Sequence, residues 1–128
     1  MRMAAAAGAG LAALDQGTVD VAGDYLRVAE ELLATMPATS WVVGRELVDA
    51  LAVRLTALAG HAGLAASRFE SALAAVEPND PFATATLVAE CAGALRGVGV
   101  RTIAAVIERM HYAAVASGFD RLAGRLAP

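Results

Sequence analysis

The spacing of apolar residues predicts helices through the first third of the chain. A first helix is expected over 3–14, where an alanine-rich run meets the turn sequence Asp15-Gln16-Gly17. A second is expected over 19–35, ended by Pro37. Its apolar residues recur at steps of four, three and four, namely Ala22, Leu26, Ala29 and Leu33. This spacing places them on one face of a helix, with charged residues on the other side.

The next two expected helices meet at glycines. A third helix is expected between a cap at Thr39 or Ser40 and a stop at Gly60. Its apolar stripe consists of Val43, Leu47, Leu51, Leu55 and Leu58. A fourth helix is expected to follow the turn that Gly60 and Gly63 flank. Its candidates for burial are Leu64, Phe69, Ala72, Leu73 and Val76.

The clearest boundary in the chain is the segment 77–81. Pro78 breaks one helix, Asp80 can cap the next, and Pro81 fits a first helical turn, where no backbone donor is needed. The pattern therefore predicts a fifth helix over 81–96, and its nearly uniform apolar character indicates cover on more than one side. A sixth helix is expected over 101–117.

Composition agrees with a single all-α domain over residues 1–128. Alanine occupies 33 of the 128 positions, and six residues are aromatic. Small side chains allow helices to approach closely, whereas β-sandwich strands need β-branched and aromatic residues. All ten basic residues are arginine, and thirteen acidic residues give a net charge of −3, which argues against direct nucleic-acid binding.

An internal repeat relates the first and second pairs of helices. At a shift of 43 residues, a set of small, turn and large apolar positions recurs: Gly10, Gly17, Ala22, Leu26 and Ala29 become Val53, Gly60, Ala65, Phe69 and Ala72. Glycine relieves the backbone at the turn, and small residues avoid a clash where helices cross. The repeat predicts about six antiparallel helices in three helical hairpins. A closed helical bundle is the alternative.

This spacing resembles the tetratricopeptide repeat (TPR). Two stretches, 51–77 and 88–95, resemble the degenerate TPR-like repeats of large bacterial LuxR-type and MalT-type transcriptional regulators. The resemblance implies a non-enzymatic scaffold that binds a protein or senses a ligand. The chain departs from the common pattern in its period of 43 rather than 34 residues and in small residues at the usual tryptophan and tyrosine positions.

Candidate chemistry in the sequence is sparse, so we expect no enzyme activity, cofactor or metal. Cys91 lies among alanines on the most apolar helix, which favours a buried small residue over a nucleophile. Glu108 and His111 have the spacing of a di-iron ligand pair, but no second pair accompanies them. The chain also lacks lysine, which excludes a Walker-type phosphate loop.

The same features predict a cytoplasmic protein that does not span a membrane. One cysteine cannot form an internal disulfide, which favours a reducing compartment. No uncharged stretch is longer than 32–44, which is too short for a transmembrane helix and contains Pro37. The first 14 residues have the outline of a signal peptide, but their centre is alanine and glycine, so a cytoplasmic helix is the preferred interpretation.

If the hairpins stack, their first helices line an inner surface that could bind a partner. The candidate binding residues are Leu47, Arg54, Leu58 and Arg96. An apolar groove with two arginines suits an extended or helical protein segment that carries an acidic group. Two alternatives stay open: a small helical bundle that forms a homodimer or binds a small apolar ligand, and an enzyme or metal protein built on such a bundle.

Overall fold

A computed structural model describes residues 2–37 and 41–96, together with residues 105, 108, 109 and 112. This part of the chain contains five α-helices and no strand, which confirms the all-α fold class. The helices are α1 (Met3–Asp15), α2 (Val19–Ala34), α3 (Arg45–Leu58), α4 (Ala62–Val76) and α5 (Pro81–Arg96). Residues 105, 108, 109 and 112 are helical, and the rest of the predicted sixth helix lies outside the described residues.

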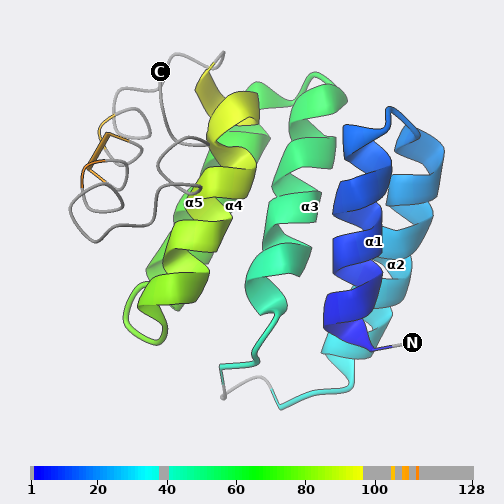
Figure 1. Ribbon diagram of the computed structural model, residues 1–128, viewed down its shortest axis with the longest axis horizontal. Helices are drawn as coiled ribbons and strands as arrows, with labels where there is room; N and C mark the ends of the chain where they lie inside the picture. The colour runs from blue at the N-terminus through cyan, green and yellow to red at the C-terminus, as the bar shows by residue number, and fades with distance from the viewer. Residues whose placement is uncertain (1, 38–40, 97–104, 106–107, 110–111, 113–128) are drawn as a thin grey trace.

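Helix α3 lies in the middle of the arrangement. It packs against α1 and α2 on one side and against α4 and α5 on the other. The helices α1 and α2 also pack against each other, as do α4 and α5. Figure 1 shows α1, α3 and α5 in a near layer, with α2 behind α1 and α4 behind α5. The core therefore lies between two layers of helices.

The turns that follow α1 and α3 have the same backbone geometry, 43 residues apart. Gly17 and Gly60 adopt φ values of 81° and 87°, the left-handed region that glycine enters without a steric penalty. Each turn closes with a bond across six residues, from Thr18 N–H to Ala13 O (2.9 Å) and from His61 N–H to Thr56 O (3.2 Å). These hydrogen bonds give a donor to carbonyl groups in the last turn of each helix, where no further helical N–H follows. The turn between the two helices of a pair is thus set by local sequence.

Small residues hold the helices close at their crossings. Ala22 and Ala65, equivalent in the repeat, are both completely buried. Gly10 of α1 packs directly against α3, because a Cβ atom at this position would overlap Cδ2 of Leu51. Phe69 is buried, as expected, but its equivalent Leu26 is only half-buried. Leu26 lies on α2, at the end of the stack, where α2 packs mainly against α1 and α3.

The predictions for α3 were partly wrong. The helix begins at Arg45 with Gly44 at its N-cap, so Thr39 and Ser40, which are outside the described residues, do not cap it. Val43 and Leu58, at the two ends of the expected stripe, are 82% and 65% exposed. Leu51 of the expected stripe is buried, whereas Leu47 and Leu55 are half-buried. The other buried positions are Val48, Ala50, Val53 and Thr56. They are spread around the helix because four neighbouring helices cover it.

The segment before α5 agrees with the sequence. The Asp80 carboxylate accepts hydrogen bonds from the backbone N–H groups of Phe82 (2.9 Å) and Ala83 (3.0 Å), which confirms the cap. The predicted bounds of this helix, 81–96, are also confirmed. In α4, however, Leu64 is 49% exposed rather than buried, because it lies in the first turn of the helix beside the Gly60 turn.

The backbone geometry at Gly60 and at Gly23 predicts opposite effects of glycine-to-alanine changes at these two positions. Gly60→Ala should lower the free energy of unfolding by about 1–2 kcal/mol, because an L side chain is strained at positive φ. Gly23→Ala is the control, since Gly23 lies inside α2 with open space around it. It should raise the free energy of unfolding by about 0.5–1 kcal/mol. Urea unfolding measures both values, and a stabilising Gly60→Ala would contradict the assigned turn.

The core predicts a large difference between two phenylalanines. Phe69 is 1% exposed and Phe82 is 71% exposed. Phe69→Ala should lower the free energy of unfolding by about 3–5 kcal/mol, because it removes buried apolar surface and leaves a cavity. Phe82→Ala should change it by less than about 0.5 kcal/mol. Chemical denaturation of the two variants under the same conditions tests this, and a loss below about 1 kcal/mol for Phe69→Ala would place this side chain outside the core.

Candidate functional site

A cavity of about 490 Å³ opens where α1, α3 and α5 meet, and we call it the inner groove. Its lining combines apolar and small residues with three charged ones: Leu14, Asp15, Arg54, Leu58, Ala89, Glu90, Gly93 and Ala94. These residues come from the end of α1, the second half of α3 and the second half of α5. The groove thus joins three segments that are far apart in the sequence.

Arg54 organises the charged part of the inner groove. One terminal nitrogen, Nη2, donates to Oδ1 of Asp15 at 2.8 Å, and the other, Nη1, donates to Oε2 of Glu90 at 3.1 Å. A single side chain on α3 therefore ties the C-terminal end of α1 to the middle of α5. Such charge-assisted bonds are the stronger class of protein hydrogen bond.

The two carboxylates differ in their exposure to solvent. The Asp15 side chain is 66% exposed, whereas those of Arg54 and Glu90 are 19% and 13% exposed. Water screens an exposed pair strongly, so the Asp15 pair is the weaker one. The Arg54 bond to Glu90 lies deeper, where removing one partner is more damaging. The groove therefore has one ion pair that is largely buried and one whose carboxylate is exposed to solvent.

The structure brings together two of the four predicted binding residues. Arg54 and Leu58, one turn apart on α3, both line the inner groove. Leu47 is half-buried and packs against the core near the other end of α3, and Arg96 is exposed at the last position of α5. Neither of these two lines the groove.

Sequence reasoning missed Glu90, the deeper partner of Arg54. The signal was its position: Glu90 precedes Gly93 by three residues, so both share a face of α5. A lone acidic residue on the most apolar helix also needs a counter-charge. What the sequence could not supply is the register of α5 against α3, which sets Glu90 opposite Arg54.

Cys91 is completely buried, as expected. Burial raises the pKa of its thiol far above the ordinary value, and the neighbouring charge of Glu90 raises it further. The thiol therefore stays protonated at neutral pH, and a protonated thiol is a poor nucleophile.

The described residues contain no group of three histidine, cysteine or acidic side chains that could hold a metal ion. Glu108 is helical and exposed, while His111 lies outside the described residues. None of the described helices is long and apolar enough to cross a membrane. The chain matches no protein-family model, no curated protein and no solved structure.

The different burial of the two ion pairs predicts different contributions to stability. Arg54→Met keeps most of the side chain's volume but removes both bonds, and it should lower the free energy of unfolding by about 1–3 kcal/mol. Asp15→Asn is the control, because it removes only the exposed charge, and it should change stability by less than about 0.5 kcal/mol. Thermal and urea unfolding test the pair. Equal effects of the two changes would contradict the assigned roles.

Proposed function

We propose that this chain is a non-enzymatic helical-repeat module that binds an extended or helical segment of another protein in the inner groove. The observation that carries the proposal is the inner groove itself. It spans α1, α3 and α5 and combines apolar surface with the charged side chain of Arg54. A partner segment that lies along α3 would contact α1 and α5 at the same time.

The repeated turn supports the architecture behind this proposal. In TPR-like stacks, the first helices of successive hairpins lie side by side and form a continuous inner face. The packing of α3 between α1 and α5, and the equivalent turns at Gly17 and Gly60, are what such a stack requires. The resemblance to LuxR-type and MalT-type regulators extends the proposal to a module of a bacterial transcriptional regulator.

The chemistry of the groove favours a partner with an apolar side chain beside a carboxylate. Leu58 is 65% exposed at the rim and offers an apolar contact, while small residues at Ala89 and Gly93 leave room for a bound chain. A partner carboxylate would take the place of Asp15 at Nη2 of Arg54, because Asp15 is the exposed member of the ion-pair set. The Glu90 bond would hold the guanidinium in place during this exchange. Contacts of the partner with Leu47 and Arg96 stay a prediction.

Peptides selected from a random display library against the immobilised protein would test the groove. Leu58→Glu should weaken binding of the selected peptides at least about tenfold, equivalent to about 1.4 kcal/mol. Leu64→Glu is the matched control, since Leu64 is also an exposed leucine but lies outside the groove lining, and it should leave the affinity unchanged. Fluorescence anisotropy gives both affinities.

Asp15→Asn tests the exchange of carboxylates in the same assay. It should tighten the binding of acidic peptides, because it removes the charge that competes for Arg54. Equal binding to the Leu58 and Leu64 variants would contradict the groove as the site. An unchanged affinity of acidic peptides for Asp15→Asn would contradict the proposed carboxylate exchange at Arg54. It would leave the groove as the proposed binding site.

A further inference from the structure

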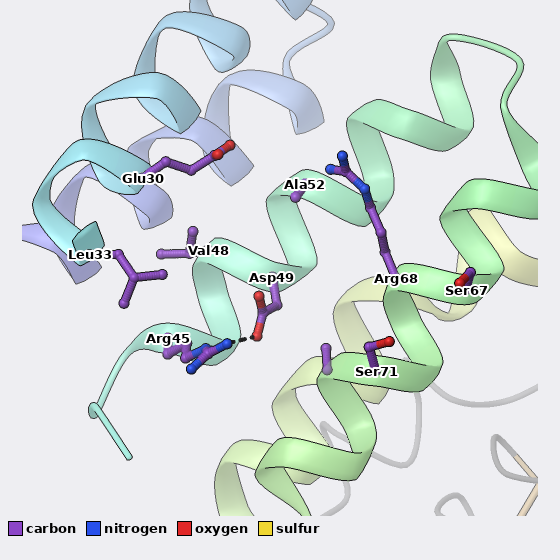
Figure 2. A pocket seen from close by; sticks show the side chains of 10 residues that line it. Glu30, Leu33, Arg45, Val48, Asp49, Ala52, Ser67, Arg68 and Ser71 are labelled. Carbon is purple, nitrogen blue, oxygen red and sulfur yellow. Dashed lines mark ion pairs between the residues drawn. The ribbon is translucent and has the colours of Figure 1, made fainter. Parts of the chain in front are cut away.

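A second cavity, of about 390 Å³, lies between α2, α3 and α4, and we call it the outer cavity. It shares no lining residue with the inner groove. Six charged or hydroxyl side chains surround it: Glu30, Arg45, Asp49, Ser67, Arg68 and Ser71. Its volume falls in the range of sites for small molecules. Figure 2 shows these side chains together with the apolar ones that complete the wall.

The acidic wall of the outer cavity contains a long ion pair between Arg45 and Asp49. Asp49 is half-buried, and its nearest basic atom, Nε of Arg45, is 3.7 Å from Oδ2, beyond hydrogen-bond distance. The same Nε atom is buried and has no hydrogen-bond partner. Glu30 lies across the cavity on α2 and adds a second negative charge. A bound cation would thus meet a carboxylate that has lost much of its water.

The basic wall lies on α4, and its polar side chains, Ser67, Arg68 and Ser71, are exposed to solvent. Within the described residues, Arg68 forms no ion pair, and the hydroxyls of Ser67 and Ser71 form no hydrogen bond. These three side chains occupy neighbouring positions of one helix, spaced at one and four residues. Figure 2 shows Glu30 and Arg68 extending from opposite sides toward Ala52 of α3.

We propose that the outer cavity binds a small zwitterion of the amino-acid class, with its ammonium group at Asp49 and Glu30 and its carboxylate at Arg68. A simple cation would leave the guanidinium of Arg68 unpaired. A simple anion would face the two carboxylates. A ligand with both charges can contact both walls at once, and ionic hydrogen bonds from a guanidinium to a carboxylate give it orientation. This site does not depend on the inner groove.

The charge state of Asp49 makes this binding sensitive to pH. Burial raises the pKa of Asp49, and the charges of Glu46 and Glu30 add to this, while Arg45 opposes it. Arg68 faces the cavity from α4. An ammonium group interacts strongly only with the ionised carboxylate, so affinity falls as the pH is lowered through the raised pKa of Asp49. Bound ammonium in turn favours ionisation of Asp49.

Calorimetric titration of the intact chain with the individual L-amino acids tests the site. For an amino acid that binds, its methyl ester and its N-acetyl derivative should each bind at least about tenfold more weakly, because each lacks one of the two charges. Asp49→Asn and Arg68→Gln should each weaken binding by a similar factor. Asp49→Asn keeps the side-chain size and Arg68→Gln shortens an exposed side chain, and circular dichroism verifies that the variants are folded.

Asp24→Asn and Arg27→Gln are the matched controls. These two residues form an exposed ion pair on α2 and do not line the cavity, so their substitution should leave the affinity unchanged. Absence of binding by every amino acid at concentrations of about 10 mM would overturn the proposal, since such a site would be too weak to act. Equal binding of the zwitterion and its ester, or full affinity of both cavity variants, would overturn it as well.

Discussion

The close packing of α3 is the constraint on which the described structure depends. Four helices contact α3, and small side chains at the crossings let these helices approach it closely. Gly10 of α1 meets Leu51 with no space for a Cβ atom, and Ala65 of α4 is completely buried. A larger residue at either position would separate the helices, because a packed core adapts poorly to added volume. The alanine-rich composition therefore reflects this geometry.

The position of α3 also explains why both cavities are built on it. Arg54 and Asp49 are five residues apart, which places them roughly 140° apart around the helix. Arg54 thus faces the layer of α1 and α5, while Asp49 faces α2 and α4. Each side chain sits between helices from different parts of the chain. A ligand in either cavity would brace α3 against its neighbours.

The two cavities differ in how far their charges are already paired. In the inner groove, Arg54 holds two carboxylates of the chain itself, so its guanidinium is oriented before a partner arrives. In the outer cavity, the ion pair of Asp49 with Arg45 is longer than a hydrogen bond, and Arg68 forms no ion pair within the described residues. The first arrangement favours exchange of one carboxylate for another, and the second favours capture of a ligand that supplies both charges.

Local signals in the sequence determined the helices, their turns and the cap at Asp80, because glycine at positive φ, proline and capping side chains act within a few residues. The sequence also placed Arg54 and Leu58 on a common surface. The true start of α3, the exposure of Val43 and Leu64, and the pairing of Arg54 with Glu90 were decided by tertiary structure. These features depend on how helices distant in sequence register against one another, and helical periodicity alone leaves that register open.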